Sequence, residues 1–133
     1  MSFYADSSGT KIYYQVRGEG DPLVLIMGFG GDGNLWEKHV AEYEKHFTCI
    51  LIDNRGVGRS DQPKGPYSTW MMAADTIAVM DHAGVVNARV AGISMGGAIA
   101  QELALNYPER VRCLALISTW PKFNHYAKTV YEN

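Results

Sequence analysis

The sequence is poor in the residues that bind metal ions or cross-link a chain. Its 133 residues include two cysteines and four histidines, and none of these fall at the spacing of a metal-binding motif. Both cysteines, Cys49 and Cys113, lie in apolar runs. We therefore predict no metal site, and we expect the thiols to be small buried apolar groups rather than the halves of a disulfide.

Charge of one sign and long apolar segments are also missing. The formal net charge is −2, which predicts neither a nucleic acid nor an anionic membrane as a partner. No apolar run approaches the roughly 20 residues that a membrane-spanning helix needs. The opening residues, MSFYADSSGT, lack the basic and apolar segments of a secretory signal. These absences lead us to expect a cytoplasmic protein.

What the sequence does contain is an alternation of short apolar runs and helical patterns. Runs bounded by turn residues predict buried strands at 22–28, 48–54, 88–94 and 111–118. The segments between them predict helices at 35–47, 69–85 and 95–107, the second with Thr69 as its N-cap. This order predicts the α/β class, with a mostly parallel sheet covered on both faces. Residues 3–18 predict an antiparallel hairpin at one edge.

The third predicted strand runs into the segment Gly92-Ile93-Ser94-Met95-Gly96, and a predicted helix follows. Gly-x-Ser-x-Gly on a strand-to-helix turn is typical of a serine nucleophile, because the sharp turn leaves room only for small residues two positions on either side. The start of the helix also brings backbone N–H groups beside the serine oxygen. We interpret Ser94 as a nucleophile, and a glycine-rich turn with an incidental serine is the alternative.

A loop with four glycines, Met27–Trp36, follows the first buried strand. Gly28, Gly30 and Gly33 match the pattern of a dinucleotide-binding loop, but the next predicted helix begins too late for that motif, near Leu35. The serine turn, which a dinucleotide site does not require, favours a loop whose backbone N–H groups stabilise an oxyanion. A flexible turn without a function is the remaining interpretation.

A polar segment, Ile52–Pro63, follows the second buried strand. Charges in a surface loop usually serve the structure rather than catalysis. We expect Asp53, Arg55 and Asp61 to pair with one another and to hold this loop.

Taken in chain order, the segments Met27–Gly31, Asp53–Asp61 and Gly92–Gly97 resemble three motifs of the α/β-hydrolase fold family. The first is similar to the family's His-Gly oxyanion loop, with Met27 where many members have histidine. The likeness is to esterases, lactonases, perhydrolases and C–C hydrolases that use no cofactor. It implies the N-terminal half of a three-layer α/β-hydrolase core, and no cofactor.

The resemblance also implies roles for individual residues. Ser94 would be the nucleophile, the backbone N–H groups of Phe29 and Met95 would form the oxyanion hole, and Gly28 and Trp120 would line the substrate pocket. The implied reaction is hydrolysis of carboxylic esters or lactones through an acyl-enzyme. A serine at this position argues against the haloalkane dehalogenases and epoxide hydrolases, which carry aspartate there. A ligand-binding protein without activity, a C–C hydrolase and a perhydrolase remain alternatives.

The family pattern also requires an acid and then a histidine after the nucleophile. The segment Ser118–Trp120 contains no acid, and His125, the one later histidine, falls in what resembles the start of a helical lid. We therefore expect residues 1–120 to be the N-terminal half of the core and residues 121–133 the start of a truncated lid. The expected partner is a second chain with the C-terminal half, or a second copy, and we expect this chain to be inactive by itself.

Overall fold

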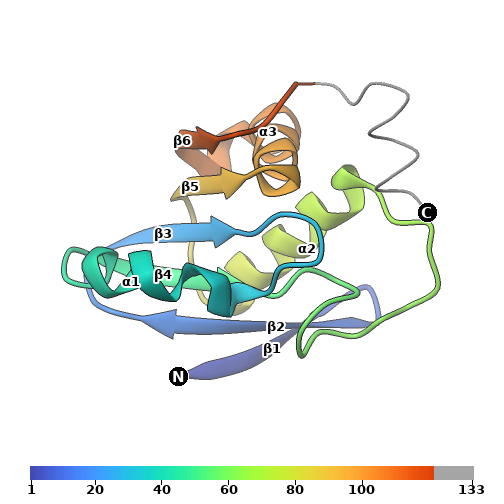
Figure 1. Cartoon of the computed structure of the whole chain (residues 1–133), viewed down its shortest axis with the longest axis horizontal. Helices are drawn as coiled ribbons and strands as arrows, with labels where there is room; N and C mark the ends of the chain where they lie inside the picture. Colours follow the sequence, from blue (N-terminus) through green and yellow to red (C-terminus); the bar gives the residue numbers. More distant parts are fainter. Residues whose placement is uncertain (122–133) are drawn as a thin grey trace.

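The computed structural model describes residues 1–121, which form one sheet with helices on both faces (Figure 1). The six strands lie in the order β1-β2-β4-β3-β5-β6. Their bounds are Ser2–Ser7 for β1, Thr10–Arg17 for β2, Asp21–Ile26 for β3, Phe47–Ile52 for β4, Ala88–Ile93 for β5 and Val111–Ile117 for β6. The α-helices are α1 Glu37–Tyr43, α2 Thr69–His82 and α3 Met95–Asn106, and two 3-10 turns are η1 Gly33–Trp36 and η2 Pro108–Arg110.

The strand directions agree with the sequence prediction. β1 and β2 form the antiparallel N-terminal hairpin, which turns at Ser8 and Gly9, both with positive φ. β2 also runs antiparallel to β4, while β3 pairs in parallel with β4 and β5, and β5 with β6. The α/β class with an antiparallel hairpin on a mostly parallel sheet is therefore confirmed. Because β4, β3 and β5 are parallel neighbours, the loops that follow them meet at one edge of the sheet.

The two faces of the sheet are covered by different helices, which gives three layers. Alternate residues of a strand point to opposite faces. In β3, Val24 and Ile26 join the core formed with α2 and α3, whereas Leu23 and Leu25 join a smaller core with Trp36 next to α1. Figure 1 shows α1 on one side of the strands and α2 and α3 on the other. The predicted three-layer arrangement is confirmed.

The helices begin differently from the prediction. The pattern at 35–47 forms η1 followed by the short helix α1, and Asp32 caps η1 with its carboxylate. Ser68, rather than the predicted Thr69, caps α2, because Ser68 keeps an extended backbone and its Oγ accepts a hydrogen bond from the Met71 N–H at 3.0 Å. In the part of the chain that the structure describes, no helix is both long and apolar enough to span a bilayer.

The two cysteines lie in unlike environments. Cys49 is buried on β4, as predicted, and this burial raises the pKa of its thiol to about 11. Cys113 on β6 is exposed, so the expectation that it is buried is wrong for this chain. β6 is an edge strand of the sheet in residues 1–121, and most of its side chains are exposed. Both thiols are free.

Candidate active site

Ser94 occupies the turn between β5 and α3, and its backbone is strained. Its φ of 56° and ψ of −122° fall in a region that residues with a side chain rarely adopt. Its N–H donates to the Ile117 carbonyl at 2.9 Å, and its own carbonyl accepts from the Gly97 N–H at 2.9 Å. The predicted strand-to-helix turn is therefore present, and the catalytic role of Ser94 stays a prediction.

The glycines on either side of Ser94 are required by close backbone approach. A Cβ on Gly92 would collide with the carbonyl group of Gly96, and a Cβ on Gly96 would collide with that of Ile26. These obstacles are backbone atoms of packed elements, which cannot move aside as a flexible side chain can. The Gly-x-Ser-x-Gly spacing therefore has a steric cause in this chain.

The loop after β3 brings Gly28 against Ser94. A Cβ on Gly28 would lie 3.1 Å from Ser94 Cβ and 3.6 Å from Ser94 Oγ. Phe29 follows and is more than half exposed. Met95 begins α3 directly after the serine and is buried. The fold thus brings the segment Gly28–Phe29 to the same turn as Ser94 and Met95.

Asn54 braces this loop, a role that the sequence pattern did not predict. Its Nδ2 donates to the carbonyl oxygen of Met27 at 3.1 Å, and the residue is only 3% exposed. The preceding residue, Asp53, accepts hydrogen bonds from the backbone N–H groups of Gly33 at 2.7 Å and Arg59 at 3.0 Å. The sequence signal for this role was the polar pair Asp53-Asn54 directly after a buried strand, because polar groups buried there need hydrogen-bond partners.

The prediction that Asp53, Arg55 and Asp61 form ion pairs with one another is wrong. Arg55 pairs instead with Asp75 of α2. Its Nε lies 2.7 Å from Asp75 Oδ2 and its Nη2 lies 2.7 Å from Asp75 Oδ1. The carboxylates of Asp53 and Asp61 accept from backbone N–H groups. Asp75 is 2% exposed, and a carboxylate so deeply buried needs a charged partner. The hydrogen bond to Asp75 raises the pKa of Arg55.

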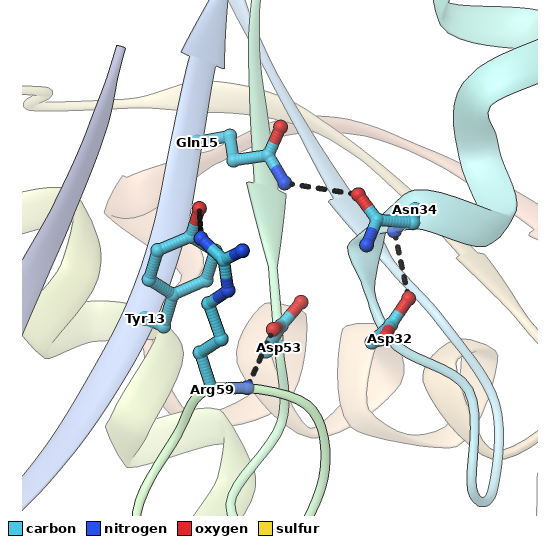
Figure 2. A pocket seen from close by; sticks show the side chains of 6 residues that line it. All are labelled: Tyr13, Gln15, Asp32, Asn34, Asp53 and Arg59. Carbon is cyan, nitrogen blue, oxygen red and sulfur yellow. Dashed lines mark hydrogen bonds between the residues drawn. The ribbon is translucent and has the colours of Figure 1, made fainter.

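A polar hollow of about 300 Å³ lies beside these braced loops (Figure 2). It is lined by side chains of β2, of the loop and turn after β3 and of the loop after β4: Tyr13, Gln15, Asp32, Asn34, Asp53 and Arg59. Gln15 Nε2 donates to Asn34 Oδ1 at 3.2 Å, and Arg59 Nη1 donates to the Tyr13 hydroxyl at 3.3 Å. These polar groups already make hydrogen bonds that hold the loops in place. We therefore interpret the hollow as part of the outer surface of these loops rather than as the reaction site.

The histidine of α2 does not pair with the acid beside it. His82 Nδ1 lies 2.6 Å from the Tyr14 hydroxyl, whereas Asp81 accepts a hydrogen bond from Arg110 at 2.6 Å. These contacts show that His82 does not form an Asp–His dyad with Asp81. His125 and the predicted lid, beyond Pro121, lie outside the described residues.

Trp120 comes after β6, and its backbone carbonyl accepts a hydrogen bond from Gln101 Nε2 of α3 at 3.1 Å. Its predicted place in a substrate pocket stays a prediction. Within residues 1–121, no three His, Cys, Asp or Glu side chains gather into a group that could hold a metal ion.

Comparison with known proteins gives consistent matches. A sequence model of the alpha/beta hydrolase fold family matches residues 21–132. A protein provisionally named carbamate hydrolase RutD, from Azorhizobium caulinodans, is 38% identical over 97% of this chain and 49% of its own length. Another, provisionally named non-heme bromoperoxidase BpoC, from Mycobacterium tuberculosis, is 42% identical over 82% of this chain and 42% of its own length.

The structural comparison agrees with the sequence comparison. The structure of Est816, described as an N-acyl homoserine lactone degrading enzyme, superposes with a TM-score of 0.85 at 38% identity, over 88% of this chain and 45% of that one. This chain spans about half the length of the curated relatives that it matches. Their names differ in the chemistry they state, so the similarity identifies a family rather than a reaction. The chain belongs to the α/β-hydrolase fold family.

Proposed function

We propose that this chain supplies the nucleophile and the oxyanion hole of a serine hydrolase that acts on carboxylic esters or lactones. The backbone of Ser94 is the observation that carries the proposal. A residue with a side chain keeps a φ of 56° and a ψ of −122° only where the surrounding structure imposes it, and such strain is concentrated at functional sites. Here β5, α3 and the Ile117 carbonyl impose it. The strained turn holds the serine outside both regular elements.

The proposed reaction proceeds through an acyl-enzyme. Ser94 Oγ attacks the carbonyl carbon of the ester while a histidine takes the hydroxyl proton, and the carbonyl oxygen becomes an oxyanion. The N–H groups of Phe29 and Met95 donate to that oxygen. The histidine then returns the proton to the leaving alkoxide, and a water molecule releases the acid from Ser94. The removal of one oxyanion donor typically lowers the rate by about 10²–10³.

The choice of esters and lactones is supported by a relative and by the shape of the turn. The Est816 structure is described as a lactone-degrading enzyme and matches 88% of this chain. Gly28 places no side chain above Ser94 Oγ, so a planar carbonyl group could approach the serine from that side. We assign Gly28 and Trp120 to the lining of the proposed substrate pocket.

The acid and the base of the proposed site come from a C-terminal half, on the same polypeptide or on a second one. The relatives are about twice as long as this chain. Within residues 1–121, β6 pairs with β5 alone, and its side chains Leu116 and Ile117 are 42% and 39% exposed. An exposed apolar edge strand is a surface that proteins normally pair or cover. We infer that the missing half docks here, that a self-paired dimer is the alternative, and that the chain alone is inactive.

The test is turnover of a p-nitrophenyl ester by this chain joined to, or co-expressed with, a C-terminal half. Ser94→Ala should abolish turnover and labelling by a fluorophosphonate, whereas Ser2→Ala, at an exposed position of β1, should leave both unchanged. Unchanged turnover in Ser94→Ala would show that Ser94 is not the nucleophile. Ser94-dependent turnover by the 133-residue chain alone would contradict the need for a C-terminal half. Failure of the two co-expressed halves to co-elute would contradict the inferred docking at β6.

A further inference from the structure

Thr119 connects the end of β6 to the nucleophile turn. Its Oγ1 donates a hydrogen bond to the backbone carbonyl oxygen of Ser94 at 2.6 Å, and this contact spans 25 positions of sequence. Two residues earlier, Ile117 accepts the hydrogen bond from the Ser94 N–H at 2.9 Å. The short segment Ile117–Thr119 therefore binds both backbone groups of the serine.

The local geometry makes room for this contact. Ser118 has a φ of 48°, a left-handed conformation that few residues with a side chain adopt, and it lies between the two residues that bind Ser94. Gly97, in the first turn of α3, provides the space for the threonine. A Cβ on Gly97 would lie 2.5 Å from Thr119 Cβ and 2.6 Å from Thr119 Oγ1. The second glycine of Ser-Met-Gly-Gly is thus explained by Thr119, not by the serine turn itself.

The contact bears on the oxyanion hole through the planarity of the peptide bond. The carbonyl of Ser94 and the N–H of Met95 belong to one peptide group, which is planar and trans, so the two bonds point in opposite directions. A donor that fixes the direction of the carbonyl therefore fixes the direction of the N–H. The helix already supplies Gly97 N–H to the same carbonyl at 2.9 Å. Thr119 adds a donor from outside the helix. Because Thr119 follows β6, its hydrogen bond fixes the orientation of the Ser94–Met95 peptide relative to the sheet.

We propose that Thr119 is a positioning residue that aims the Met95 N–H at the oxyanion. The inference rests on the proposed function of Ser94 and Met95, and it adds a residue that touches neither the substrate nor the nucleophile oxygen. Thr119 works by holding the Ser94 carbonyl at one tilt. The benefit is greatest in the transition state, because the charge on the substrate oxygen develops there, and a misaimed donor then lowers kcat more than it changes KM.

The test compares Thr119→Val, which keeps the branched shape and removes the donor, with Thr119→Ser, which keeps the donor. In the enzyme assembled with its C-terminal half, we expect Thr119→Val to lower kcat for a p-nitrophenyl ester about tenfold per titrated active site, with KM within about twofold of the parent value. Thr119→Ser should remain within about threefold of the parent. A threonine with a merely structural role would change the amount of folded enzyme and not kcat per active site.

A second readout does not depend on activity. In the ¹⁵N-labelled 133-residue chain, Thr119→Val should shift the amide resonance of Met95, and Thr119→Ser should leave it near its original position. The proposal is overturned if Thr119→Val keeps kcat within twofold, or if its Met95 resonance does not move. Where Thr119→Val does not fold, Thr119→Ala removes the same donor with less bulk and is judged by the same two criteria.

The two proposals fail in distinguishable ways. If Ser94→Ala retains turnover, the proposed function is wrong and no kcat effect of Thr119 can be credited to the oxyanion hole. If Ser94→Ala is inactive while Thr119→Val is as active as the parent, the proposed function stands and the role of Thr119 is wrong.

Discussion

Gly28 lies so close to Ser94 that a single added carbon would lie 3.1 Å from Ser94 Cβ. Such a distance is tighter than ordinary contact, so either the loop after β3 or the serine has to move by a few tenths of an ångström. Gly28 precedes Phe29, whose N–H is a proposed oxyanion donor. The distance between the loop after β3 and the turn at Ser94 therefore couples the position of Ser94 to the position of the Phe29 N–H.

Gly28→Ala should lower turnover of a p-nitrophenyl ester by about tenfold, because small displacements of reacting groups have large effects on rate. The rate is compared per folded enzyme, because Gly28 is buried and the added carbon would also lie 3.1 Å from the Ile93 carbonyl oxygen. Gly65→Ala is the matched control, because a Cβ there meets only atoms at 3.6 Å or more. Steady-state kinetics of both variants check the prediction, and equal loss in the two variants would contradict it.

Arg55→Met should lower the free energy of unfolding by about 3–5 kcal/mol, because it leaves the buried carboxylate of Asp75 without its charged partner. Ser7 Oγ still donates to that carboxylate at 2.6 Å but cannot balance its charge. Urea unfolding measures the change. Lys45→Met, which breaks an exposed pair with Glu42, is the control and should cost less than about 1 kcal/mol. If both variants lose a similar free energy of unfolding, the buried ion pair contributes no more to stability than an exposed one.

The sheet and the nucleophile turn could be predicted because their signals are local. An apolar run between turn residues identifies a buried strand wherever it lies, and a glycine two positions from Ser94 marks a turn that only small residues allow. The hairpin ending at Arg17 and the three layers follow from such patterns together with the rule for alternating strands and helices.

The side-chain pairs could not be predicted because they depend on which elements pack together. Arg55 has acids near it in the sequence, yet it pairs with Asp75 across 20 positions, since the packing of α2 buries that carboxylate. Asn54 and Thr119 act in the same way, through contacts to distant backbone carbonyls. The exposure of Cys113 depends on what covers β6, which local sequence does not encode.

Tyr14→Phe should change how stability depends on pH. Burial raises the pKa of the Tyr14 phenol, because the charged form is poorly solvated inside the protein. Its folded pKa exceeds the unfolded value of about 10, so the stability it contributes is present below about pH 10 and is lost as the pH rises through the folded pKa. The parent protein should therefore lose stability above about pH 10 more steeply than the variant.

Urea unfolding at a series of pH values from about 8 to 11 provides the measurement. At the lower end Tyr14→Phe should cost about 0.5–1.5 kcal/mol, for the lost hydrogen bond to His82. Tyr4→Phe is the control, because Tyr4 is 50% exposed, and this variant should keep the slope of the parent. If stability falls equally steeply with pH in the parent and in Tyr14→Phe, burial does not raise the pKa of Tyr14.

Ser94→Gly should stabilise the fold while it removes the proposed nucleophile. A residue with a side chain at a φ of 56° and a ψ of −122° stores about 1–3 kcal/mol, which glycine does not. Glycine loses about 0.5–1 kcal/mol more conformational free energy on folding than alanine. The balance leaves Ser94→Gly about 1 kcal/mol more stable to urea than Ser94→Ala. At Ser2, on the extended strand β1, no strain offsets this loss, so alanine should be the more stable substitution. The order of the glycine and alanine variants should therefore reverse between the two positions, and the same order at both would mean that the backbone of Ser94 is not strained.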